Sequence, residues 1–138
     1  MESTKITVST LVNDSLENTW KYFNAPEHIV QWNAASDDWH TTFSTVDLQV
    51  GGKFNSRMEA KDGSFGFDFE GIYEVVDLNS RIVYGLEDGR KVEIVFDAKE
   101  NGTLVTETFD AETENPVELQ RGGWQAIMDN FKKHVESL

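Results

Sequence analysis

The residue with the clearest chemical potential is Glu107, a carboxylate within a segment whose alternation of polar and apolar residues predicts a strand. Counting outward from a turn at Asn101-Gly102 places Glu107 opposite Phe96 and points it inward, among aromatic side chains. A carboxylate in such surroundings must be paired or have a raised pKa. It could therefore anchor the polar end of a ligand, whereas a bulge turning it toward solvent is the structural alternative.

Arg81 is the candidate partner of this carboxylate. If Asp88-Gly89 is a two-residue turn, Arg81 lies opposite Phe96 and also points inward. Two strand spacings, about 10 Å, then separate the backbones of Arg81 and Glu107, a distance that an arginine side chain could largely span. Together with Tyr73, these residues are the polar groups that we expect to orient a bound molecule.

Other chemistries have little support in the sequence. His28, His40 and His134 lie far apart and lack the spacing of a metal site, so we expect neither metal nor cofactor. Without cysteine, thiol catalysis is excluded, and no nucleophile-elbow pattern surrounds any serine. An enzyme of cyclase or hydrolase type on a polyketide-like substrate is an alternative, with Glu107, Asp47 or His40 as acid or base. Because no second group is fixed at a useful distance, we assign no catalytic residue.

An antiparallel sheet is the first predicted element that holds these residues in place. The region between about residues 39 and 109 alternates as antiparallel strands, divided by three hairpin dipeptides, Asp62-Gly63, Asp88-Gly89 and Asn101-Gly102. As two-residue turns they place Met58 opposite Phe67, and Val83 opposite Ile94. One face of the sheet is then apolar and the other faces water.

Helical segments flank this sheet. Residues 4–12 alternate as a first strand, and two short helices follow, one after Asp14 and one from Pro26 toward Trp32. A long C-terminal helix has an apolar stripe at helical spacing, formed by Trp124, Ile127, Met128, Phe131, Val135 and Leu138. Such a helix against a curled sheet can enclose a cavity. Trp32 and Trp39 flank a polar loop at residues 33–38, where the mouth of that cavity would lie.

A set of short motifs, in order along almost the whole chain, resembles one known family. They are residues 47–54 (DLQVGGKF), Asp62-Gly63, residues 69–75 (FEGIYEV), residues 81–84 (RIVY), Gly102-Thr103 and Gly123-Trp124. The ordered set is similar to the START-like (SRPBCC) superfamily, in the branch of the activator of heat-shock protein 90 ATPase.

The resemblance implies an α+β helix-grip fold, with about seven antiparallel strands curved around a long C-terminal helix and two short helices after strand 1. It also implies a small hydrophobic or amphipathic ligand between sheet and helix, such as a lipid, a flavonoid or a polyketide-like molecule. The co-chaperone of that name has a further N-terminal domain, for which 138 residues leave no room. A modulator of a chaperone or another protein is thus a second alternative. Our candidate ligand-binding residues are Trp32, Trp39, Phe54, Met58, Phe67, Phe69, Tyr73, Arg81, Phe96, Glu107, Trp124 and Met128.

Composition and charge limit the partners. A chain of 138 residues predicts a single domain, residues 1–138, and a net charge of −13 disfavours nucleic acid and anionic membranes. Residues 1–5 do not resemble the start of a secretory signal, and no apolar run is long enough for membrane insertion, so we expect a cytoplasmic protein. An edge strand at residues 39–47 could pair across a weak dimer, although a monomer is equally consistent with the sequence.

Overall fold

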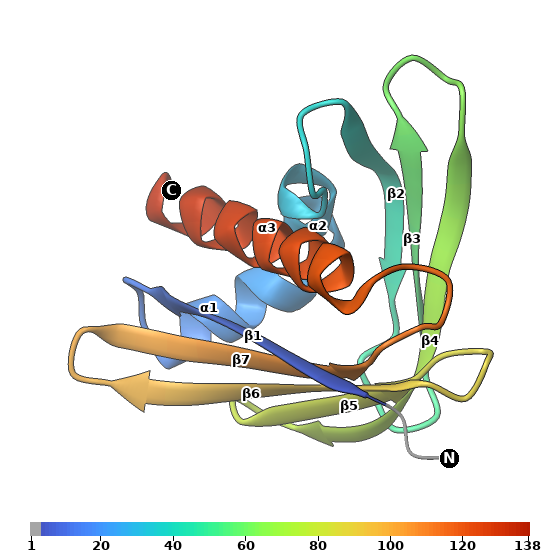
Figure 1. Ribbon diagram of the computed structural model, residues 1–138. Coiled ribbons are helices and arrows are strands. Elements are labelled where there is room, and N and C mark those ends of the chain that lie inside the picture. The colour runs from blue at the N-terminus through green and yellow to red at the C-terminus, as the bar shows by residue number, and fades with distance from the viewer. Residues whose placement is uncertain (1–3) are drawn as a thin grey trace.

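The computed structural model describes residues 4–138 (Figure 1). Residues 1–3 belong to the N-terminal segment in which we expect no secretory signal, and they lie outside the described residues. Seven antiparallel strands form one sheet in the order β1-β7-β6-β5-β4-β3-β2. The strands are β1 (Lys5–Val12), β2 (Trp39–Val46), β3 (Lys53–Ala60), β4 (Gly66–Asp77), β5 (Arg81–Gly85), β6 (Lys91–Lys99) and β7 (Gly102–Asp110), and the helices are α1 (Leu16–Asn24), α2 (Pro26–Trp32) and α3 (Val117–Glu136).

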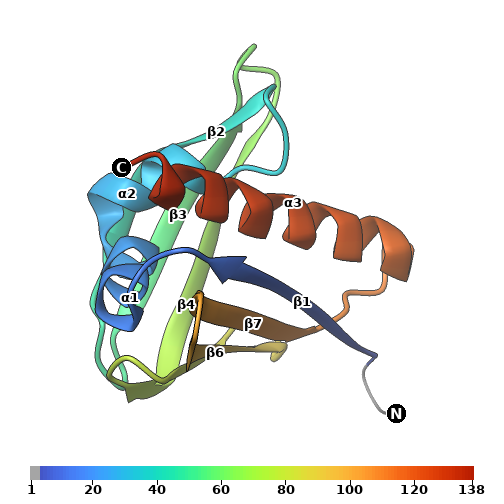
Figure 2. The same ribbon diagram turned by 90° about the vertical axis from the view of Figure 1, so that its left-hand side faces the viewer.

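The sheet curls around the long helix, which confirms the predicted fold class. Figures 1 and 2 show α3 lying across the concave side of the sheet, while α1 and α2 cover one end. β2 is an edge strand, as predicted, and β1 forms the other edge. Among the described residues, no helix is both long and apolar enough to span a membrane.

The β3–β4 hairpin has the predicted register, with Met58 paired with Phe67 and Arg57 paired with Asp68. The β5–β6 register was predicted wrongly by one residue. Ile82, rather than Val83, pairs with Ile94, because Leu86 and Arg90 close a three-residue loop. Gly89 completes that loop with a φ of 91°, a left-handed conformation that favours glycine.

This one-residue shift corrects the position of Arg81. A register error of one residue moves every side chain of a strand to the opposite face of the sheet. Arg81 therefore lies on the outer face, where its Nε donates to Glu93 Oε2 at 2.5 Å. It is no partner for Glu107.

The β6–β7 register was also predicted wrongly, by two residues. Ile94 pairs with Glu107 and Phe96 pairs with Val105, because the two-residue turn is Glu100-Asn101. Gly102 instead begins β7 in close contact with β1, where a Cβ would lie 2.1 Å from the Val12 carbonyl oxygen. A shift of two residues preserves the faces of a strand, so Glu107 points inward as predicted.

The helices differ from prediction mainly at their ends. α1 begins after Ser15, whose side chain accepts a hydrogen bond from the Asn18 amide. α3 begins at Val117, well before Trp124, and buries Met128, Phe131 and Val135 against the sheet. Leu138 was expected in this apolar stripe but lies beyond the helix and is 64% exposed.

Candidate functional site

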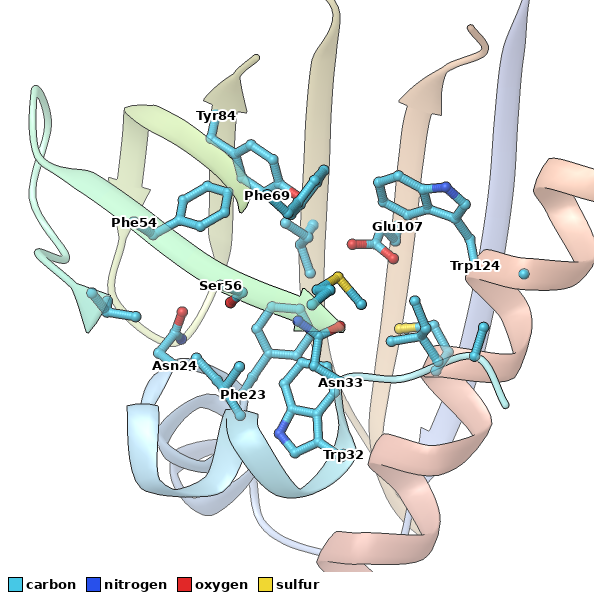
Figure 3. A pocket seen from close by; sticks show the side chains of 18 of the residues that line it. Phe23, Asn24, Trp32, Asn33, Phe54, Ser56, Phe69, Tyr84, Glu107 and Trp124 are labelled. Carbon is cyan, nitrogen blue, oxygen red and sulfur yellow. The ribbon is translucent and has the colours of Figure 1, made fainter. Parts of the chain in front are cut away.

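A pocket of about 540 Å³ lies between the concave face of the sheet, the α1–α2 end and α3 (Figure 3). This volume falls within the range of about 300–1,000 Å³ that is usual for small-molecule sites. Aromatic and aliphatic side chains form most of its wall, with a few polar groups among them. The curvature of the sheet creates this space, because α3 cannot contact the whole of a concave surface.

The structure brings most of the predicted site residues to this one pocket. Phe96 does not line it, since its ring packs against Trp20 and Phe23 with centroid distances of 5.0 and 5.4 Å. Arg81 is on the other face of the sheet. The predicted residues that line the pocket are Trp32, Trp39, Phe54, Met58, Phe67, Phe69, Tyr73, Glu107, Trp124 and Met128.

Glu107 is the carboxyl group of the pocket. It lies in β7 between Val8 of β1 and Ile94 of β6, without a bulge, and is only 7% exposed. Burial raises the pKa of Glu107 from 4.5 to about 8, and no hydrogen bond or opposite charge among residues 4–138 offsets that effect. At neutral pH the protonated form of this carboxyl group is therefore favoured.

Two tyrosines accompany Glu107 in the pocket wall. Burial, and then the nearby charge of Glu107, raise the pKa of Tyr84 well above its ordinary value. Burial, and then Asp47, likewise raise the pKa of Tyr73. Both hydroxyls stay neutral and can donate a hydrogen bond to a ligand or to a carboxylate.

Tyr84 was missed by the sequence reasoning, because the error in the β5–β6 register assigned it to the outer face. The same three-residue loop brings Arg90 to the edge of the pocket, where its Nε donates to Asp88 Oδ2 at 2.6 Å. The signal that could have found them is glycine at the third position of Glu87-Asp88-Gly89, which suits a three-residue loop. Asn24, Asn33 and Ser56 are further polar lining residues that we did not predict.

Four aromatic side chains of the pocket form a continuous wall, which we call the aromatic wall: Phe54, Phe69, Tyr84 and Trp124. Phe54 and Tyr84 meet edge to face at 4.6 Å between centroids, and Phe69 contacts both Tyr84 and Trp124 at 6.3 and 6.1 Å. Trp124 is held in place by stacking on Phe109 at 3.9 Å. These contacts preorganise a rigid apolar surface around the carboxyl group.

The exposed end of the pocket is also aromatic. Trp39 packs against Phe65 and Phe67 of the β3–β4 hairpin at 5.9 and 6.0 Å, and these phenylalanines are 61% and 41% exposed. Trp32 has a different role from Trp39, since it is buried and donates its indole N–H to the Tyr22 carbonyl at 3.2 Å. The structure therefore places Trp39, rather than both tryptophans, at the rim.

Gly122 and Gly123 lie inside α3 instead of at its start. A Cβ at either position would meet no atom within 4 Å, so close packing does not require these glycines. Gly123 lines the pocket and Gly122 is exposed. Each glycine costs a helix roughly 1 kcal/mol relative to alanine. Gly123 thus keeps space free in the pocket wall.

The histidines are partly brought together by folding. His28 Nδ1 and His134 Nε2 are 2.9 Å apart between α2 and α3, and burial followed by His28 lowers the pKa of His134. Within residues 4–138, no three histidine, aspartate or glutamate side chains gather closely enough to hold a metal ion.

Comparisons with known proteins agree with this architecture. The family model described as Activator of Hsp90 ATPase homolog 1-like protein matches residues 13–136. The AHSA1-like protein from Aeromonas hydrophila is 48% identical, over 97% of this chain and 93% of that one, with a TM-score of 0.91. A protein from Cytophaga hutchinsonii is 45% identical, over 98% and 92% of the two chains, with a TM-score of 0.81.

More distant structures share only the fold. A protein from Nitrosomonas europaea is 17% identical, over 96% of this chain and 94% of that one, with a TM-score of 0.84. No curated protein matches the chain.

Proposed function

The chain belongs to the Activator of Hsp90 ATPase homolog 1-like family, and from this premise and its pocket we propose that it binds a small hydrophobic or amphipathic molecule between the sheet and α3. The observation that carries the proposal is a pocket of about 540 Å³ with a mostly apolar wall and one buried carboxyl group. We also propose that the chain acts as one domain in the cytoplasm.

Apolar burial supplies most of the affinity in this proposal. A ligand that removes about 400 Å² of its own and the wall's apolar surface from water gains roughly 10 kcal/mol. Association costs at least about 4 kcal/mol in lost freedom. The remainder, at most about 6 kcal/mol, corresponds to a Kd of tens of micromolar or weaker. Polar groups such as Glu107, Tyr73 and Tyr84 would then improve affinity and orient the ligand.

Native mass spectrometry of the protein purified from its own host is the first test, followed by a thermal-shift screen of lipids, flavonoids and polyketides. We expect either a co-purifying small molecule or a rise of several degrees in the melting temperature with one chemical class of ligand. A ligand that leaves chemically altered would instead make the protein an enzyme.

Two glycine variants locate the site. Gly123→Leu adds a side chain at the pocket wall, whereas Gly122→Leu makes the same change at the neighbouring exposed position. We expect Gly123→Leu to abolish the thermal shift and Gly122→Leu to retain it. If both variants bind the ligand equally well, the pocket is not the site.

A further inference from the structure

The polar and aromatic groups of the pocket are arranged for a particular ligand chemistry, and this inference rests on the proposed function. We infer that the ligand is a cationic amphiphile, a tertiary or quaternary ammonium whose nitrogen sits beside Glu107 and the aromatic wall, with its apolar part filling the rest of the pocket. The observations that carry this inference are an unpartnered buried carboxyl group and the aromatic wall, of which Phe69, Tyr84 and Trp124 border that group.

The carboxyl group lacks a partner inside the protein. Glutamate is rarely buried to this extent unless it is paired, yet the flanking residues on β1 and β6 are Val8 and Ile94. No cation among residues 4–138 pairs with Glu107, although its side chain borders the open space of the pocket. A positive charge on the ligand supplies the missing partner, and the low dielectric of the mostly apolar wall strengthens the pairing.

The aromatic wall favours the same charge. Figure 3 shows Phe69, Tyr84 and Trp124 bordering the space into which the Glu107 carboxyl points. The faces of aromatic rings carry negative potential, and clusters of them bind alkylated ammonium groups in preference to anions. A ring wall with a carboxylate therefore selects a cation over a neutral molecule of the same shape. The net charge of −13 also attracts cations to the protein.

Other charged groups near the pocket do not oppose this selection. The titratable residues that share the lining with Glu107 are Tyr73 of β4, Tyr84 of β5 and Arg90 of the β5–β6 loop, whereas α1, α2 and α3 contribute none. Both tyrosines are neutral. Arg90 is the one cation of the lining, and its charge is compensated by Asp88 at 2.6 Å and by the nearby Asp110.

Three probes with the same chain and different head groups test the inference: decyltrimethylammonium, decanol and decanoate, each far below its micelle-forming concentration. Isothermal titration calorimetry at pH 8 should give a Kd for the ammonium at least about tenfold below that of decanol, with decanoate weakest. Equal binding of decanol, or tighter binding of decanoate, would overturn the inference and leave the proposed function standing. If none of the three binds, the inference fails, whereas the proposed function is decided by the thermal-shift screen of lipids, flavonoids and polyketides.

Matched variants identify the group responsible. Glu107→Gln keeps the shape and removes the charge, so the tenfold preference for ammonium over decanol should disappear while decanol still binds. Glu93→Gln makes the same change on the outer face of the neighbouring strand and should preserve the preference. A preference that survives in Glu107→Gln would contradict the inference.

The pH dependence of the unmodified protein gives a second test that needs no variant. An ammonium requires ionised Glu107, whose pKa in the empty pocket is about 8. Its affinity should therefore rise by up to about tenfold per pH unit from pH 6 to pH 8, while that of decanol stays constant or falls. An ammonium affinity that is flat across this range would show that Glu107 does not contact the cation.

Discussion

Replacing Glu107 by glutamine should stabilise the empty protein, and increasingly so as the pH rises. In the unfolded chain this carboxyl group has a pKa near 4.5, whereas burial raises the pKa to about 8 in the fold. Between these values the unfolded chain releases a proton that the folded protein keeps. The free energy of unfolding therefore falls with rising pH, at about 1.4 kcal/mol per pH unit, and the full stability is present only below pH 4.5.

The magnitude follows from that interval. Between pH 5 and pH 8, Glu107 should lower the free energy of unfolding by about 3 to 4 kcal/mol. Glu107→Gln does not titrate, so the stability difference between variant and unmodified protein should grow by that amount over the same range. Taking the difference cancels the contributions of all other groups that titrate alike in both proteins.

Urea unfolding followed by circular dichroism at pH 5, 6, 7 and 8 measures this difference. Glu93→Gln serves as the control, since it makes the same substitution at a carboxyl group on the outer face of the sheet. Two parallel pH profiles for Glu107→Gln and the unmodified protein would refute the reasoning. Glu107 would then be solvated or paired in solution, and we would no longer regard it as a polar anchor in an apolar pocket.

Four other substitutions test the packing, each by urea unfolding. Gly122→Ala should raise the free energy of unfolding by about 0.5–1 kcal/mol, because the helix gains an alanine in open space; a loss would show that the glycine is structurally required. Arg81→Ala should lower the free energy of unfolding by at most about 1 kcal/mol, as is usual for an exposed ion pair. A larger loss would indicate that the Arg81 side chain is buried. Phe131→Ala should lower the free energy of unfolding by about 3–5 kcal/mol, because this side chain is fully buried. Leu138→Ala should change it by no more than about 0.5 kcal/mol, because Leu138 is exposed beyond the helix. Similar losses for the two variants would contradict the observed end of α3.

Local patterns were sufficient for much of this fold. Alternation at period two identified the strands, and helical spacing identified the buried face of α3 at Met128, Phe131 and Val135. The inward direction of Glu107 was predicted correctly although the β6–β7 register was wrong, because an error of two residues preserves the faces of a strand. The pleat fixes only that successive side chains alternate between the two faces of the sheet; which of these faces is the inner one depends on the register.

Turn geometry limited the prediction elsewhere. The sequence Asp88-Gly89 suits a two-residue turn, yet the chain uses a three-residue loop in which Gly89 adopts a positive φ. Because this loop is one residue longer than the predicted turn, the β5–β6 register shifts by one residue, so that Tyr84 faces the pocket and Arg81 faces solvent. Both turns are compatible with these residues, and only pairing with the neighbouring strands selects one of them.

The residue pattern was therefore enough to predict the elements and their order, and it made Glu107 a candidate for an inward carboxylate. The absence of a bulge at Glu107, and of a partner for it among the described residues, follows from the folded arrangement, because it depends on residues from β1, β5, β6 and α3 that are far apart along the chain. It also decided the size of the pocket, which is set by how strongly the sheet curls and how closely α3 approaches it. Such distances are fixed by the packing of all the elements together, and no local spacing encodes them.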